Sequence, residues 1–193
     1  RYLSQFLSDR RVVETNPLIW QPILQGIVLS TRPKKSGKNY ERIWDRQAND
    51  SPLRVISRRQ AEKLQARLGE AVLVDFGMRY GNPSTASRLE ALQQAGCQRI
   101  LLAPLYPQYS ATTTATANDA AFAALGKMRW QPAIRTMPAY FSEPAYVEAL
   151  ARSIAQGVAA LAFEPDLVLT SYHGMPRSYL EKGDPYYYHC LET

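Results

Sequence analysis

The chain has 193 residues, of which 46% are hydrophobic and 21% charged, a balance that fits one globular domain or one domain and part of another. No apolar run approaches the roughly 18 residues of a membrane-spanning helix, and the pattern of a secretion signal is not seen. The net charge of +6 favours an acidic partner, but no nucleic-acid-binding motif accompanies the scattered basic residues, so we expect no nucleic acid.

Helix start and stop signals organise the first part of the chain. Residues 2–7 have an amphipathic pattern, and the polar region 32–51 is predicted as a helix followed by a surface loop. Three further helices are predicted where a capping side chain precedes a proline, which suits the first helical position. They begin at Asn16-Pro17, Ser51-Pro52 and Asn82-Pro83, and glycines end the last two, at Gly69 and Gly96.

Short apolar runs predict four buried strands, at residues 71–76, 100–103, 133–137 and 167–171. Helical patterns from about 112 to 125 and from 143 to 161 alternate with the later runs. Strands and helices that alternate at this spacing are typical of a parallel sheet. The sequence therefore predicts an α/β fold with a doubly wound parallel sheet flanked by helices.

Both ends of the sequence are interpreted as cut. The chain opens at Arg1, without a methionine and next to an amphipathic pattern, and closes at Thr193 in what is predicted as the first turns of a helix. We therefore expect an incomplete fold.

His173 directly follows the last predicted strand. In an open parallel sheet, ligands bind outside the carboxyl ends of the strands, and Gly174 allows a ligand to approach closely. A neutral imidazole can accept a proton or bind a borderline metal ion. A buried histidine that is hydrogen-bonded to the backbone explains the same pattern, so location alone does not decide. His189 lies in a predicted helix and is interpreted as structural or surface-exposed.

Five other side chains are candidates for binding. Arg79 follows the first predicted strand, where it either holds a carboxylate of a ligand or has no ligand role, as an ion pair or a solvated surface charge. Tyr109 follows the second strand and either faces a planar aromatic ligand or packs at a corner. Ser51 is a well-placed helix cap, and Arg32 and Tyr40 offer charge and hydrogen bonding.

Four segments, in order along the chain, resemble the ferrochelatase family. The run from Tyr106 to Thr114 is similar to the family's Tyr-Pro-Gln-Tyr-Ser segment, and Ser171-Tyr-His-Gly-Met-Pro176, followed by Glu181-Lys-Gly-Asp-Pro-Tyr186, looks like its histidine motif. The other two are Gly77-Met-Arg-Tyr80 with Asn82-Pro83, and the positions Arg32-Pro-Lys-Lys35, Tyr40 and Ser51-Pro52-Leu53. The resemblance covers essentially the whole chain.

This resemblance implies a lyase of haem biosynthesis that inserts Fe²⁺ into protoporphyrin IX, or into coproporphyrin III as in some bacteria. Fe²⁺ and the porphyrin are then substrates, and no tightly bound cofactor is expected. The family's active-site histidine maps onto His173, as metal ligand or proton acceptor. Porphyrin contacts are predicted at Arg32, Tyr40, Ser51, Arg79 and Tyr109.

Departures from the family narrow what the chain can do. The family's second active-site residue, a glutamate, and the family's first strand have no counterpart in this sequence. We expect residues 1–165 to form most of the first chelatase domain, residues 166–193 to begin the second, and the chain alone to be inactive. Members with a [2Fe–2S] cluster place a cysteine where this chain has Ala111, so we predict no cluster.

Three alternatives stay open: a non-enzymatic porphyrin or haem carrier, a chelatase of the sirohydrochlorin type, and an α/β domain that binds another carboxylate. The two cysteines form neither a disulfide framework nor a metal-ligand spacing, which favours the cytoplasm. The apolar residues Leu18, Ile19 and Trp20 either pack in the core or form an exposed lip. Such a lip predicts peripheral contact with the inner membrane.

Overall fold

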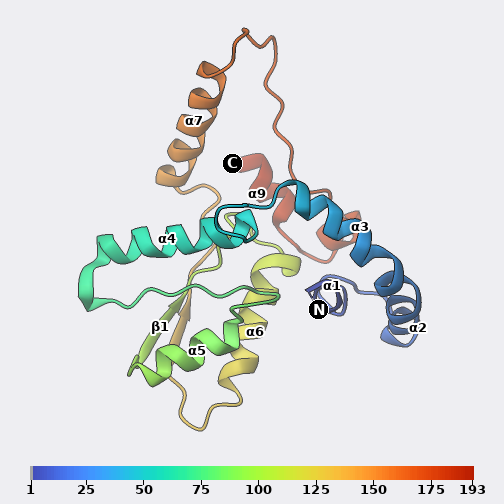
Figure 1. The fold of residues 1–193 in the computed structure, drawn as a ribbon, viewed down its shortest axis with the longest axis vertical. Helices are drawn as coiled ribbons and strands as arrows, with labels where there is room; N and C mark the ends of the chain where they lie inside the picture. Colours follow the sequence, from blue (N-terminus) through green and yellow to red (C-terminus); the bar gives the residue numbers. More distant parts are fainter. Residues whose placement is uncertain (1) are drawn as a thin grey trace. The chain divides into compact units, whose positions relative to one another are not determined.

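The computed structural model describes residues 2–193, which are mostly helical with a small parallel sheet (Figure 1). The sheet consists of β1 (Arg99–Leu102) and β2 (Ala133–Thr136). The chain divides into two compact units, and each is described by itself below. The first comprises the residues up to Leu102 together with Thr116–Arg135, and the second comprises Ala103–Ala115 and Thr136–Thr193.

The core of the first unit lies between the sheet and two helices, α5 (Thr85–Gln94) and α6 (Thr116–Leu125). These helices lie side by side next to β1 (Figure 1). Leu89, Ala121 and Ala124 form the buried cluster, and the side chains packed against it include Ile100, Leu102, Met128 and Ile134. Small alanines let α6 approach its neighbours closely. Leu101, which alternates to the other face of β1, is 65% exposed, so the described residues show helices on one face of the sheet.

Most of the predicted helices form, with the expected caps. In α2 (Pro17–Ile23), the Asn16 side chain accepts a hydrogen bond from the Leu18 N–H at 3.0 Å. Ser51 caps α4 (Pro52–Leu68), which ends at Gly69 with a φ of 67°, in the left-handed region that glycine adopts without a steric penalty. The other helices confirmed at predicted positions are α1 (Tyr2–Leu7), α3 (Leu29–Arg42), α6, α7 (Pro144–Ala159) and α9 (Tyr186–Glu192).

The helix start predicted at Asn82-Pro83 is wrong, although Gly96 ends the helix as expected. Ser84 is the cap of α5, because its hydroxyl accepts a hydrogen bond from the Ser87 N–H at 3.1 Å. The Pro83 carbonyl instead accepts a bond from the Met78 N–H at 2.7 Å. This bond closes a turn ahead of the helix, so the Asn82-Pro83 pair belongs to the turn.

Two of the four predicted strands, at 100–103 and 133–137, are confirmed as β1 and β2. Residues 71–76 and 167–171 do not form strands within residues 2–193, because neither segment has a neighbouring strand there. Gln65 takes the place of such a neighbour, accepting a bond from the Val74 N–H at 2.8 Å and donating to the Val72 carbonyl at 2.9 Å. An extended segment becomes a strand only when a second backbone completes the ladder. Residues 2–193 therefore show a small α/β element with a two-stranded parallel sheet, and not the whole doubly wound sheet that the sequence predicts.

Candidate functional site

The six side chains predicted from the sequence are divided between the two units. Arg32, Tyr40, Ser51 and Arg79 belong to the first unit, and Tyr109 and His173 belong to the second.

In the second unit, α9 holds the segments that carry both Tyr109 and His173. The His173 N–H donates to the Tyr186 hydroxyl at 3.2 Å, and the Tyr109 N–H donates to Nδ1 of His189 at 3.1 Å. Tyr186 and His189 are three positions apart on α9 and therefore lie on one face of that helix. The His173 side chain is exposed, so the interpretation of a buried histidine is wrong and the imidazole is accessible to a ligand.

Asp184 fixes the loop that contains Tyr109. Its Oδ2 accepts bonds from the Ser110 hydroxyl at 2.9 Å and the Ala111 N–H at 2.8 Å, while Oδ1 accepts a bond from the Tyr186 N–H at 3.0 Å. Ser110 is fully buried. Asp184 is not among the residues predicted from the sequence, although an aspartate before a proline at a helix start is typical of a side chain that bonds the backbone two residues on.

His189 has a structural role, as expected. Its ring stacks on Phe141, with centroids 3.6 Å apart and planes 11° apart. Burial lowers the pKa of His189, and the nearby Glu192 and Asp184 carboxylates act in the opposite direction. The neutral form is also the one in which Nδ1 can accept the Tyr109 N–H.

We expect the stability of the protein to fall as the pH drops from about 6.5, the usual histidine pKa, towards the lower pKa of folded His189. In that window the unfolded chain binds more protons than the folded chain, so acid favours unfolding. His189→Asn keeps an acceptor but does not titrate, so its melting temperature should depend less steeply on pH. The control is His173→Asn, at an exposed histidine. Equal slopes for the natural protein and His189→Asn would contradict this role.

In the first unit, Ser51 is confirmed as a helix cap. Its hydroxyl accepts a bond from the Arg54 N–H at 3.4 Å, and its own N–H donates to Asp50 at 2.7 Å. The buried Asp50 carboxylate also lies 3.4 Å from both Arg54 and Arg58, which compensate its charge. A capping hydroxyl still has its own hydrogen to donate. The two candidates on α3, Arg32 and Tyr40, are exposed.

Arg79 is engaged in an ion pair with Asp9, which is one of the two interpretations that the sequence allows. The Tyr80 hydroxyl donates to the same carboxylate oxygen at 2.9 Å, and the Arg79 Cζ atom lies 4.3 Å from the Tyr80 ring centroid. Burial and the hydrogen bond to Asp9 raise the pKa of Tyr80 to about 12, so its hydroxyl stays protonated. Arg79 nevertheless remains 22% exposed. An open hollow of about 410 Å³ adjoins it, lined by Gln5, Ser8, Asp9, Arg79, Asp119, Ala120 and Ala123.

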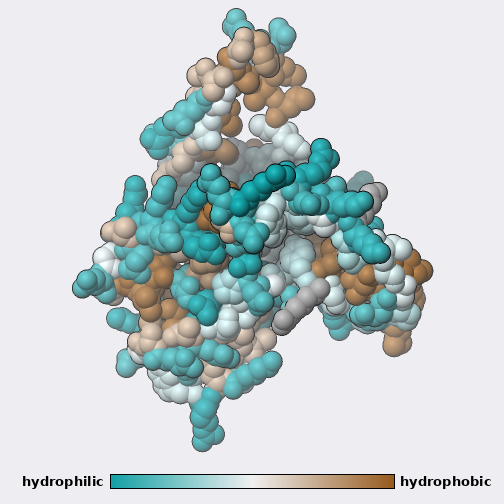
Figure 2. Space-filling view, in the orientation of Figure 1, coloured by the Kyte–Doolittle hydropathy of each residue, from teal (hydrophilic) through white to brown (hydrophobic). Residues whose placement is uncertain are grey.

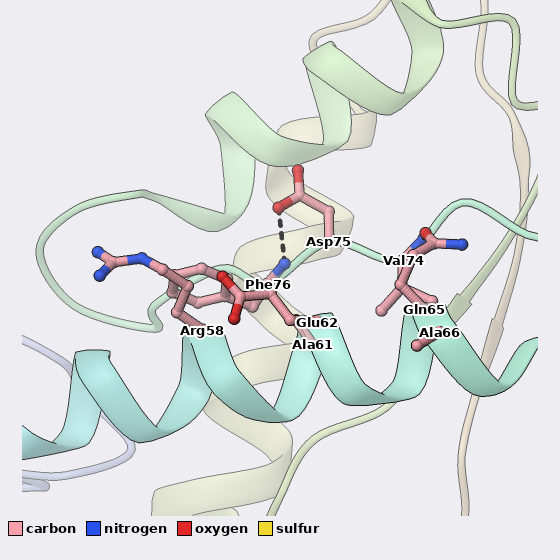
Figure 3. A pocket seen from close by; sticks show the side chains of 8 residues that line it. All are labelled: Arg58, Ala61, Glu62, Gln65, Ala66, Val74, Asp75 and Phe76. Atoms are coloured by element: carbon pink, nitrogen blue, oxygen red, sulfur yellow. Dashed lines mark hydrogen bonds between the residues drawn. The ribbon is translucent and has the colours of Figure 1, made fainter.

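A second open groove, of about 440 Å³, runs between α4 and the extended segment 74–76 (Figure 3). Val74 and Phe76 border it from the segment, and Asp75 points away from α4. Asp75 instead pairs with Arg88 of α5 at 3.5 Å. None of the predicted site residues lines this groove, which offers packing surface rather than convergent polar groups.

The family model of ferrochelatase matches residues 1–193, the whole chain. The chain belongs to the ferrochelatase family. It is 63% identical to a ferrochelatase of Mesorhizobium japonicum, and 60% identical to those of Rhizobium meliloti and Brucella anthropi, over 195 aligned residues in each case. These alignments cover all of this chain but only 55%, 58% and 56% of the relatives, so the chain spans a little over half their length.

Two absences among the described residues concern metal cages and membrane-spanning helices. Among residues 2–193, no three histidine, cysteine, aspartate or glutamate side chains come together as a possible metal cage. No helix in these residues is both long and apolar enough to cross a membrane.

Proposed function

We propose that the complete protein is an enzyme that inserts Fe²⁺ into protoporphyrin IX to form protohaem. The match of the ferrochelatase family across the whole chain, with relatives at 58–63% identity, carries this proposal. The exposed His173 within the family-like histidine motif supports it, because an accessible imidazole can accept a proton or bind the metal ion. Because the chain spans little more than half of its relatives, the activity is proposed for the complete protein.

Metal insertion replaces two pyrrole protons with Fe²⁺, so the site must take up protons as the metal enters. A neutral imidazole at His173 can accept a proton or present a nitrogen to Fe²⁺. The macrocycle must also bend to expose its nitrogen lone pairs, and contacts remote from the centre offset that strain. Arg32, Tyr40, Ser51, Arg79 and Tyr109 are proposed as these contacts. Arginines suit the porphyrin carboxylates, whereas hydroxyls suit hydrogen bonding.

We infer that the protein holds no [2Fe–2S] cluster at the position of Ala111. This residue has a methyl side chain, which cannot ligate iron, and its N–H is committed to Asp184.

We also propose that residues 71–76 and 167–171 become strands in the complete protein. Both are apolar and, apart from Ala71, which ends a 3-10 helix (Gly69–Ala71), lie outside helices. Exposed fractions of 54% for Leu73 and 83% for Leu169 are costly for unpaired segments. Pairing them would complete a doubly wound sheet, with residues 1–165 in a first domain and 166–193 in a second. The 193-residue chain alone is proposed to be inactive.

Metalloporphyrin formation tests the proposed function directly. The complete protein should convert protoporphyrin IX with Fe²⁺, or with Zn²⁺ as a spectroscopic substitute, as followed by the porphyrin absorbance. Binding without insertion would favour a carrier. Insertion into sirohydrochlorin instead of protoporphyrin would favour the alternative chelatase, and insertion by the 193-residue chain alone would contradict its proposed inactivity.

An apolar surface on α2 supports peripheral contact with the inner membrane from the cytoplasmic side. Leu18 and Ile19 of α2, and Ile27 in the helical segment that follows it (Leu24–Val28), are 84%, 60% and 62% exposed. Figure 2 shows apolar side chains gathered where Figure 1 places α2. Trp20 differs, because its Nε1–H donates to the Leu7 carbonyl at 2.7 Å and its ring is half-buried. The exposed-lip interpretation therefore fits Leu18 and Ile19, whereas Trp20 packs inward.

We expect Leu18→Asp/Ile19→Asp to weaken binding to anionic phospholipid vesicles by about tenfold or more, because burying each apolar side chain is worth about 1.5–3 kcal/mol. Co-sedimentation measures the effect. The control is Gln25→Asp/Asn39→Asp, which adds the same charge at exposed polar positions of the same unit. Equal losses of vesicle binding in both variants would show that the added charge alone causes the loss. Unchanged binding of Leu18→Asp/Ile19→Asp would contradict the proposed membrane contact.

A further inference from the structure

The loop that carries Arg79 and Tyr80 is fastened to the N-terminal segment of the first unit. The Asp9 carboxylate accepts bonds from both side chains, and the Gly81 N–H donates to the Gln5 side chain at 2.9 Å. The rings of Tyr2 and Phe6 meet the Tyr80 ring edge-on, with centroids 6.2 and 5.3 Å apart.

A single, largely shielded carboxylate oxygen therefore orients two neighbouring side chains. The Asp9 side chain is only 10% exposed, and its Oδ2 receives both the Arg79 Nη2–H and the Tyr80 hydroxyl. The Tyr80 ring lies 4.3 Å from the Arg79 Cζ atom, which restrains the guanidinium from a second direction.

We propose that Asp9 is a positioning residue that holds the Arg79 guanidinium ready for a carboxylate of the porphyrin. This inference rests on the proposed function, in which Arg79 contacts the substrate. An arginine side chain loses rotational freedom when it binds, and ordering it beforehand removes that cost from the binding step.

The geometry leaves room for a second anion beside Asp9. A guanidinium has five N–H donors, and the bond to Asp9 uses Nη2. Arg79 is still 22% exposed and borders the open hollow of about 410 Å³.

Displacement of Asp9 by the substrate is the competing arrangement, and burial argues against it. If a porphyrin carboxylate took Arg79 away, Asp9, which is now 10% exposed, would keep only neutral donors, the Tyr80 hydroxyl and the Arg11 N–H, which donates to Oδ1 at 2.9 Å. An uncompensated carboxylate in such surroundings is strongly unfavourable. Asp9 therefore keeps the guanidinium in place while the ligand binds to its other donors.

Binding of protoporphyrin IX and of its dimethyl ester to the complete protein tests this role. Both compounds offer the same macrocycle, but the ester has no free carboxylate. In Asp9→Asn, we expect affinity for the free acid to fall about tenfold, while affinity for the ester stays unchanged. A merely structural role would weaken both alike. Asp9→Glu keeps the charge but shifts the carboxylate, and should show a smaller, equally selective loss.

Asp119→Asn is the matched control, because it removes the other aspartate–arginine pair at this hollow, with Arg11, and does not touch Arg79. In an Arg79→Gln background, Asp9→Asn should have no further effect on the preference for the acid. Tighter binding of the free acid by Asp9→Asn would show that Asp9 competes with the porphyrin carboxylate for Arg79. An unchanged preference for the acid over the ester would show that Asp9 does not influence carboxylate binding. Either result overturns the inference. A natural protein that binds neither compound would instead contradict the proposed function.

Discussion

Replacing His173 by alanine should lower the rate of metal insertion by the complete protein about 10²–10⁴-fold, the usual loss for a group that transfers a proton in the rate-limiting step. The imidazole is exposed, and the hydrogen bond that fixes this segment comes from the His173 backbone and not from its side chain. The substitution therefore removes the chemistry and leaves the contact with Tyr186 in place. Initial rates of zinc-protoporphyrin formation measure the effect.

Binding and stability separate this chemical role from a structural one. Porphyrin affinity and the melting temperature of His173→Ala should stay close to those of the natural protein. His189→Asn is the informative control, because His189 supports the Tyr109 loop from inside the second unit. A His173→Ala protein that retains more than about a tenth of the natural rate would show that another group handles the protons, since general acid–base catalysis is worth far more.

The local signals of the sequence predict the helices well. Asn16 and Ser51 cap helices that begin at the following proline, because a cap and its partner N–H are only two or three residues apart. The start at Asn82-Pro83 fails for the same local reason. Ser84, two residues after Asn82, offers a competing hydroxyl, and this hydroxyl caps the helix.

Strand pairing and site partners depend on distant parts of the chain. Residues 71–76 have the apolar character of a strand but need a second backbone, which no local pattern specifies. Arg79 and Tyr109 are likewise recognisable as candidates, because each follows a predicted strand. Asp9, which bonds Arg79, and Asp184, which bonds the loop of Tyr109, are not recognisable in this way. Asp9 is 70 positions from Arg79, and Asp184 is 74 positions from Ser110, so only the fold brings them together.

Asp184→Ala should destabilise the protein by about 3 kcal/mol, the scale of removing a charged acceptor from partly buried donors. Three bonds disappear together, from the Ser110 hydroxyl, the Ala111 N–H and the Tyr186 N–H. Ser110 is fully buried, so water cannot readily replace the lost acceptor. The first two bonds secure the loop after β1 and the third secures the start of α9. Urea unfolding of the complete protein measures the change.

The same change should also weaken catalysis beyond its effect on folding, because α9 anchors the segments of both Tyr109 and His173. At temperatures where Asp184→Ala is still folded, we expect a raised KM for porphyrin. Asp166→Ala is the matched control, since it removes an exposed aspartate of the same unit and should cost less than about 0.5 kcal/mol. Equal destabilisation by the two variants would mean that the bonds of Asp184 contribute no more than surface charge, and the loop would then be held by its packing instead.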